Sequence, residues 1–173
     1  MTKHANMVCI HCHLAKPRTD KCELCEESVC ASCVIRPTPE RVQYWSSTDR
    51  PKETECKWVC PRCFDETLEP IYERYDQALE AAHNTHYFPK AYRGAPPVLR
   101  KARQPVTVDN GVDREDVLTK LQLVAVQQGF NGLIHLEIES KKQRMVDGYS
   151  KMVWRGTALP ADLDTEKLER GWY

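Results

Sequence analysis

Residues 22–33 read CELCEESVCASC, which places four cysteines in two pairs that each enclose two residues. Two further pairs of the same form, Cys9/Cys12 and Cys60/Cys63, lie on either side of this stretch. An enclosure of two residues lets both sulfurs of a pair reach one tetrahedral ion at ~2.3 Å, and two such pairs complete four-coordination. The spacing therefore predicts two closed structural zinc sites. Their eight ligands are Cys9, Cys12, Cys22, Cys25, Cys30, Cys33, Cys60 and Cys63.

Composition favours metal over disulfides. All nine cysteines of the 173 residues lie between Cys9 and Cys63, in a segment too poor in large aliphatic residues to fold without a crosslink. The start, MTKHANMVCIHCHLAK, lacks the apolar run of a secretory signal, and no segment approaches the ~20 apolar residues of a membrane helix. We expect a soluble, cytoplasmic protein, and in that reducing compartment clustered thiols are typical of metal sites.

Two arrangements of the pairs are compatible with the spacing. A sequential one joins Cys9/Cys12 to Cys22/Cys25. An interleaved one joins Cys9/Cys12 to Cys30/Cys33, and is favoured because it ties the whole segment into one rigid body. The ninth cysteine, Cys56, has an open role, although a lone cysteine is more often a small apolar residue than a ligand.

The order of the four pairs, with gaps of nine, four and twenty-six residues and KWVCPRC at the last, resembles the FYVE-type cross-brace zinc finger over about residues 5–68. The resemblance implies that fold. It does not carry the lipid pocket, since PRTDKCELC here replaces that family's basic, histidine-rich run and no tryptophan precedes Cys9. CPRC also resembles the last pair of RING ubiquitin ligases, but Cys25 stands where those proteins have histidine.

Charge gives little support for a lipid or nucleic-acid partner. The chain has 25 basic and 25 acidic residues, so it lacks the basic excess that is typical of such binders. Eight thiolates and two zinc ions would bring residues 1–63 to a net charge of about −2. A local patch of Lys16, Arg18 and Lys21, or the basic stripe in residues 90–103, would have to supply the contacts.

The rest of the chain predicts an α+β architecture. Apolar residues at helical spacing indicate a connecting helix over residues 67–85, which follows a zinc module over residues 1–66. Residues 86–173 are expected to form a small antiparallel α+β domain. It should contain a strand near 87–94, a helix from Asp113 to Gly129 and a β-hairpin of 131–139 with 148–158. In the first strand of the hairpin, Ile134, Leu136 and Ile138 alternate with polar residues and are expected on one side. The tail should add a short helix before Gly171.

This second part is similar to the small bacterial heavy-metal-binding domain family over about residues 86–160. The likeness rests on LQLVAVQQGFNGLIHLEI, followed by YSKMVWRGTALP with the element Gly156, Thr157 and Ala158. It implies a possible homo-oligomer. The family's metal role is not implied, because the segment contains no cysteine and only His86 and His135.

No phosphate-binding glycine loop, nucleophile elbow, H-E-x-x-H motif or paired-acid signature occurs, so no catalytic or cofactor-binding residue is assigned and an enzyme is not expected. The leading hypothesis is a non-catalytic, adaptor-type interaction protein. Trp45, Trp58 and the stripe at 90–103 are candidate contacts. The alternatives are a phosphoinositide-binding module, a RING-like ubiquitin ligase and a nucleic-acid binder.

Overall fold

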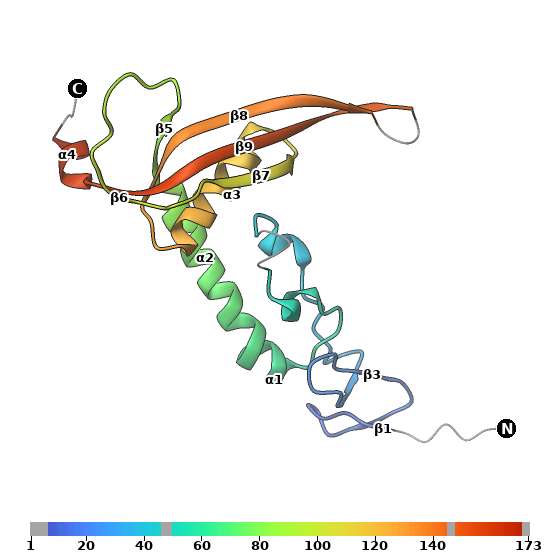
Figure 1. Ribbon diagram of the computed structural model, residues 1–173. Helices are drawn as coiled ribbons and strands as arrows, with labels where there is room; N and C mark the ends of the chain where they lie inside the picture. The colour runs from blue at the N-terminus through green and yellow to red at the C-terminus, as the bar shows by residue number, and fades with distance from the viewer. Residues whose placement is uncertain (1–6, 46–49, 145–147, 171–173) are drawn as a thin grey trace. The chain divides into compact units, whose positions relative to one another are not determined.

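The computed structural model describes residues 7–45, 50–144 and 148–170 of the chain. It divides the chain into two compact units, the cysteine unit (Met1–Asp76) and the sheet unit (Gln77–Tyr173). The division falls inside α2 (Glu69–His83), within the segment expected to connect the two parts. Helices and antiparallel or mixed strands together give the α+β class that the sequence predicts (Figure 1).

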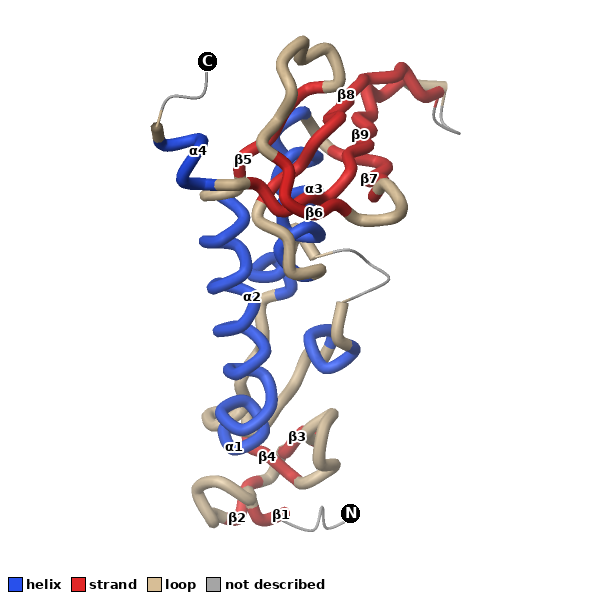
Figure 2. The backbone as a smooth tube through the Cα atoms, turned by 60° about the vertical axis from the view of Figure 1, so that its left-hand side comes forward, coloured by secondary structure: helices blue, strands red, loops and turns tan. Residues whose placement is uncertain are grey.

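Two short hairpins open the cysteine unit (Figure 2). In the first, β1 (Met7–Val8) pairs antiparallel with β2 (Ala15–Lys16), and in the second, β3 (Thr19–Lys21) pairs with β4 (Ser28–Cys30). Two single turns follow, η1 (Pro39–Val42) and η2 (Lys52–Glu55). These elements are too short to bury much apolar surface, so something besides a hydrophobic core must hold them.

A continuous helical stretch ends the cysteine unit, and it contains a wide turn. After α1 (Pro61–Cys63), the segment η3 (Phe64–Leu68) is a π turn, in which the N–H of Glu69 donates to the carbonyl of Phe64. The next residue, Pro70, has no N–H to give, so a regular bond is lost there in any case. Pro70 is the second residue of α2, and it lies within the continuous helical stretch directly after the π turn.

The apolar stripe of this helix is buried as predicted. Leu68, Ile71, Tyr72 and Tyr75 lie in the interior of the cysteine unit. Trp45 stacks on Tyr75, with ring centroids 5.4 Å apart. The small core of this unit thus combines aromatic side chains of the helix with a few aliphatic ones, among them Val29, Val42 and Val59.

The sheet unit is built on one five-stranded sheet. Its order is β5–β8–β9–β6, and β7 also pairs with β9. Since β7 pairs with Trp154–Ala158 and β6 with Ala161–Leu163, these two strands follow one another along the same edge of β9. The strands are β5 (His86–Pro89), β6 (Val98–Lys101), β7 (Val106–Gly111), β8 (Gly132–Arg144) and β9 (Ser150–Leu163).

Strand β5 departs from the expected antiparallel pattern, because it pairs parallel with β8. Parallel neighbours need a long crossover connection, and here the chain between them forms β6, β7 and a helix before it returns. The expected strand near 87–94 is therefore shorter, and it runs in the same direction as its neighbour.

Helix α3 (Arg114–Gln127) covers one face of the sheet. The Asp113 side chain caps its first turn by accepting from the N–H of Asp116, and Gly129 follows its end with a positive φ of 77°. Both ends agree with the sequence analysis. The core on this face consists of Val117, Leu118, Leu121, Ala125, Leu133, Leu136 and Ala158.

A β-bulge changes which face the residues of β8 occupy. The register between β8 and β9 shifts between Ile134 and Glu137, and His135 there has a positive φ of 55°. The alternation predicts Ile134 and Leu136 on one side, but Leu136 packs in the α3 core while Ile134 packs in a separate cluster with Ala161 and Leu163. The bulge inserts one extra residue, so the two side chains point to opposite faces.

The second face of the sheet has its own small cluster. Phe88, Val98 and Leu159 pack against it, as does Leu168 of the short helix α4 (Thr165–Glu169). The tail helix lies where the sequence predicts one, and the terminal Trp172 and Tyr173 fall outside the described ranges. No helix of the described residues combines the length and apolarity needed to cross a membrane.

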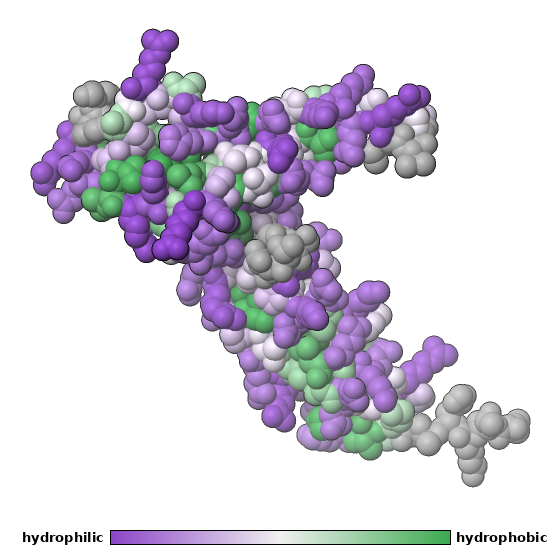
Figure 3. Space-filling model, in the orientation of Figure 1, coloured by the Kyte–Doolittle hydropathy of each residue, from purple (hydrophilic) through white to green (hydrophobic). Residues whose placement is uncertain are grey.

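Strands β8 and β9 continue past the rest of the sheet as a two-stranded ribbon (Figure 1). The pairing with β5 ends at Leu136, and the pairing with β7 ends at Trp154. Residues 141–144 and 150–153 therefore pair only with each other, and we call them the arm. The space-filling view shows mostly hydrophilic side chains there (Figure 3).

We expect Gly156→Ala to destabilise the sheet unit. A Cβ at Gly156 would contact Val117 Cγ1 and lie 2.8 Å from Leu121 Cδ1, so α3 would have to move away from β9. Overpacking of this kind costs about 1–3 kcal/mol. Urea unfolding of the full chain, followed by circular dichroism, measures the change. Thr157→Ala, which removes an exposed hydroxyl contact to Thr107, is the control, and equal losses in both variants would contradict the packing argument.

Candidate metal centre

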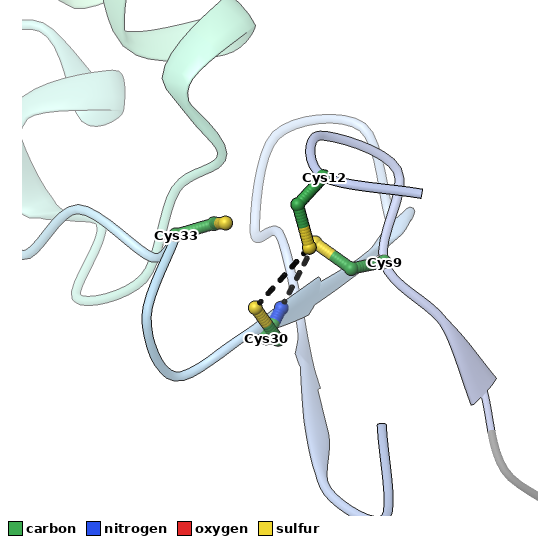
Figure 4. A group of neighbouring side chains, drawn as sticks. All are labelled: Cys9, Cys12, Cys30 and Cys33. Carbon is green, nitrogen blue, oxygen red and sulfur yellow. Dashed lines mark hydrogen bonds between the residues drawn. The ribbon is translucent and has the colours of Figure 1, made fainter. Parts of the chain in front are cut away.

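The paired cysteines converge into two clusters. Cys9, Cys12, Cys30 and Cys33 form the first (Figure 4), and Cys22, Cys25, Cys60 and Cys63 form the second. Within each cluster the sulfurs lie within 4.8 Å of one another. This is the interleaved, cross-brace-like arrangement that the sequence analysis favours over the sequential one.

The spacing of the sulfurs fits one tetrahedral ion in each cluster. The Sγ atoms of Cys12 and Cys30 are 3.8 Å apart, and those of Cys25 and Cys60 are 3.9 Å apart. Two sulfurs at ~2.3 Å from one tetrahedral zinc ion would lie ~3.8 Å apart. The two clusters are each able to hold one metal ion, consistent with two structural zinc ions.

The backbone turns in the same way at all four cysteine pairs. The carbonyl of the first cysteine in each pair accepts a hydrogen bond from the N–H four residues later, at 2.8 to 3.0 Å. This bond closes the turn and leaves both sulfurs on its inner side. The donors are His13, Glu26, Val34 and Phe64.

Two of these donors have an unusual backbone. His13 has a φ of 57° and Glu26 a φ of 62°, in the left-handed region that glycine adopts at least cost. Each follows the first pair of its cluster and directs the chain into the returning strand of a hairpin. The sequence gives no sign of a left-handed backbone at these two positions, because neither is a glycine or an asparagine.

The backbone bonds between the pairs are also repeated from one cluster to the other. The N–H of Ile10 donates to the carbonyl of Ser28 at 2.8 Å, and the N–H of Glu23 donates to that of Trp58 at 2.9 Å. In both cases the donor follows the first cysteine of its cluster. The acceptor lies two residues before the first cysteine of the partner pair, so the two sites are built by the same scheme.

Backbone donors stabilise a thiolate in each cluster. Burial, the largest influence on Cys9, raises its pKa, but N–H groups led by those of Cys12 and Cys30 lower the pKa to about 6. Burial also raises the pKa of Cys22, while donors led by the N–H of Cys60 bring it down to about 7. The N–H to sulfur distances from Cys30 and Cys60 are both 3.3 Å. Thiolate is the form that binds zinc.

Other thiols in the clusters resist ionisation. The hydrogen bond with Cys30, followed by burial, raises the pKa of Cys33 to about 12. Burial and the neighbouring thiols raise the pKa of Cys63. Four like charges so close together need a counter-charge, and a divalent cation at the centre supplies it. The donor set therefore fits a zinc ion better than it fits four uncompensated thiolates.

Closed coordination limits the chemistry of both clusters. The first cysteine of every pair is buried, and Cys25 is the most accessible ligand. Four sulfur ligands leave no position for an activated water, so such sites stabilise a fold and do not hydrolyse substrates.

Cys56 lies outside both clusters. Its thiol is half-buried, and burial, followed by the charge of Glu23, raises its pKa. A thiol with a raised pKa is a weak ligand and a weak nucleophile at neutral pH. His11 and His13 are not members of a cluster either, and both line a hollow beside the second one.

The two candidate tryptophans are engaged within the cysteine unit. Trp45 stacks on Tyr75, and the guanidinium of Arg36 lies 4.8 Å from the ring centre of Trp58. Both indoles are half-buried. Their contacts favour packing over partner recognition.

The basic stretch 90–103 does not form one strip. Lys90 follows β5 and pairs with Glu137 at 2.7 Å, whereas Arg100 lies on β6 and pairs with Asp162 at 2.8 Å. Strands β5 and β6 stand at opposite ends of the sheet order. The concentration of positive charge in the sequence is therefore divided between two edges of the sheet.

Comparison with protein-family models, with curated proteins and with solved structures finds no match to this chain. The likeness of the cysteine unit to FYVE-type fingers thus rests on the spacing of the eight cysteines and on their interleaved geometry. The likeness of the sheet unit to bacterial heavy-metal-binding domains rests on its short sequence motifs alone.

We expect the purified chain to carry two zinc ions, and paired substitutions to reveal which cysteines share one. Cys9→Ser with Cys30→Ser removes two ligands of one cluster and should release one ion. Cys9→Ser with Cys22→Ser removes one ligand from each cluster, so both zinc ions should bind more weakly or be lost. Native mass spectrometry counts the ions, and Cys56→Ser is the control that keeps two.

Sequential pairing would give the opposite pattern in this experiment, because Cys9 and Cys22 would then share an ion. Chelation should also unfold the cysteine unit, because metal binding and folding are coupled in such small modules. A cysteine unit that kept its structure after complete removal of metal would contradict a structural role for the ions.

Proposed function

We propose that this chain is a zinc-binding, non-catalytic interaction protein, in which the cysteine unit displays a surface for a protein partner. The two cysteine clusters support zinc binding. Their closed coordination supports a structural role for the ions, which hold short hairpins in place. The surface that those hairpins present is the basis for the interaction.

The observation that carries the proposal is a group of exposed apolar side chains around the first cysteine pair. Met7, Val8, Ile10 and Leu14, which we call the apolar tip, have exposed fractions of 46%, 57%, 43% and 56%. They lie on or between β1 and β2, whose register places Val8 opposite Ala15. Figure 3 shows hydrophobic side chains at this end of the cysteine unit. Clustered exposed apolar residues mark interaction sites.

A hollow of about 560 Å³ adjoins the apolar tip. Ile10 belongs to both, and the rest of the lining includes His11, Glu27 and the ion pair Arg62–Glu66, whose atoms are 3.1 Å apart. An apolar ridge beside a hollow with several polar groups in its lining offers a partner both buried contact and oriented hydrogen bonds. Protein interfaces combine an apolar centre with a polar rim in this way.

Charge favours a protein partner over an anionic membrane. Each cluster of four thiolates with one divalent cation has a net charge of −2, which opposes the positive side chains around it. Lys16, Arg18 and Lys21 follow the apolar tip, but Glu26 and Glu27 lie on the neighbouring hairpin. A phosphoinositide headgroup needs a more concentrated positive field.

In this proposal the sheet unit supplies a second face for binding or self-association. Strand β5 ends the sheet on one side, and its pairing covers only part of β8. An uncovered strand edge is a ready template for another chain.

We expect Val8→Glu with Leu14→Glu to abolish partner binding without loss of metal. The partner would be isolated by quantitative affinity capture, and binding would then be measured between purified components, where the variant should lose at least ~10-fold in affinity because hot-spot truncations typically cost more than 1 kcal/mol. Leu99→Glu is the matched control, because Leu99 is an exposed apolar residue of the sheet unit, 69% exposed. Native mass spectrometry confirms two ions in each variant.

Two results would overturn this proposal. One is a purified interaction that is equally strong in the apolar-tip variant and the Leu99→Glu control. The other is binding to phosphoinositide-containing vesicles that depends on Val8 and Leu14, which would make the apolar tip a membrane contact. A ubiquitin-discharge assay with a loaded carrier enzyme tests the RING-like alternative, because that alternative requires the chain to stimulate the discharge of ubiquitin.

A further inference from the structure

The arm is an extended structure, and within the described residues no further strand pairs with either of its edges. Residues 141–144 of β8 and 150–153 of β9 pair only with each other, in the register Lys141 with Val153 through Arg144 with Ser150. An isolated two-stranded ribbon is marginally stable in water, because it has no face on which to build a core. Such a ribbon is typically retained for what it contacts.

The arm is strongly basic within a chain of zero formal net charge. Its cations are Lys141, Lys142, Arg144 and Lys151, and no acidic residue lies among its described positions. Asp147 is the one acid between residues 140 and 154 of the sequence. Within the described ranges none of the four cations takes part in an ion pair, in contrast to Lys90 and Arg100 elsewhere in the same unit.

The cation at the base of the arm is paired, and the uncompensated positive charge begins beyond it. At the base, Arg155 pairs with Asp109 at 2.9 Å and lies opposite Glu139 in the β8–β9 register, so the cation is compensated. Beyond this point the four cations of the arm are exposed and have no ion-pair partner among the described residues. The potential is therefore concentrated on the ribbon itself and not spread over the sheet.

Both faces of the arm carry this charge. Cross-strand partners share a face, so Lys141 and Lys151 lie on one face, and Lys142 and Arg144 lie on the other. Gln143 and Ser150 add a hydrogen-bonding group to each face. A ligand with a flat surface would contact the cations on one face of the arm only, whereas a ligand that surrounds the ribbon would contact the cations on both faces.

We infer that the arm binds double-stranded DNA by entering the major groove. The groove is ~12 Å wide and ~8.5 Å deep, and it admits a two-stranded ribbon with phosphates on both walls. Four residues per strand give the arm a length of ~13 Å, enough to reach across the groove floor. Lysines and the arginine contact the phosphates on either side, and Gln143 faces the base edges.

Other ligands fit these observations less well. The major groove of double-stranded RNA is too narrow to admit side chains to the bases. A flat membrane surface would contact only one face of the arm, whereas the four cations are divided between both faces. Two arms of the same sign repel each other, so a second copy of the chain is not drawn to this ribbon at low salt.

The test measures binding of the full zinc-loaded chain to a short fluorescent DNA duplex by anisotropy, over about 50 to 200 mM salt. Four phosphate contacts predict a slope of about −3.6 in log affinity against log salt, equivalent to a loss of about 100-fold over that range. The variant K141Q/K142Q/R144Q/K151Q should lose binding at low salt. The control K101Q/R103Q removes two exposed cations from outside the arm and should retain the affinity and the slope of the parent chain.

Several outcomes would overturn the inference. They are the absence of binding at the lowest salt, equal losses in the arm variant and the control, and affinity for duplex RNA equal to that for DNA. Binding of anionic vesicles that depends on the four arm cations, without DNA binding, would assign the arm to a membrane instead. Circular dichroism and zinc content establish that each variant is folded, and a misfolded arm variant would be replaced by the single variants, each of which should lower the slope by about 0.9.

Discussion

The cysteine unit depends on two clusters, in each of which four sulfur atoms lie close together. Backbone N–H donors favour the thiolate form of Cys9 and Cys22, while neighbouring thiols and burial oppose ionisation of Cys33 and Cys63. A divalent cation resolves this conflict, because it compensates charge that hydrogen bonds offset only in part. The hairpins and single turns around the clusters have little apolar core of their own, so their order depends on the same ion.

The two clusters share more than their ligand type. Equivalent backbone bonds close the turn at every cysteine pair and join the pairs within each cluster. A reciprocal bridge between Ile35 and Val59, with N to O distances of 2.9 and 3.0 Å, links the chain after the third pair to the chain before the fourth. This bridge connects the two clusters through the backbone.

Sequence reasoning succeeded where local chemistry determines structure. The spacing of Cys9 and Cys12, repeated three times, predicts ligands because tetrahedral coordination constrains the turn, and Asp113 and Gly129 mark the ends of α3 through capping. It failed where long-range register decides. The bulge at His135, the parallel pairing of β5 with β8 and the separation of Lys90 from Arg100 all depend on strands distant in sequence. The left-handed backbone at His13 and Glu26 had no residue signal.

Interleaving also imposes an order on assembly at the ribosome. All ligands of the first cluster, Cys9 to Cys33, precede Cys60 in the sequence, so the first cluster is complete on the nascent chain before the last two ligands of the second cluster leave the ribosome. During that interval Cys22 and Cys25 form an incomplete site with two thiols, held in place by a hairpin that already exists. The second cluster then closes on a prepared half-site when its last two ligands arrive. Synthesis from the N-terminus thus allows the two sites to be loaded one after the other.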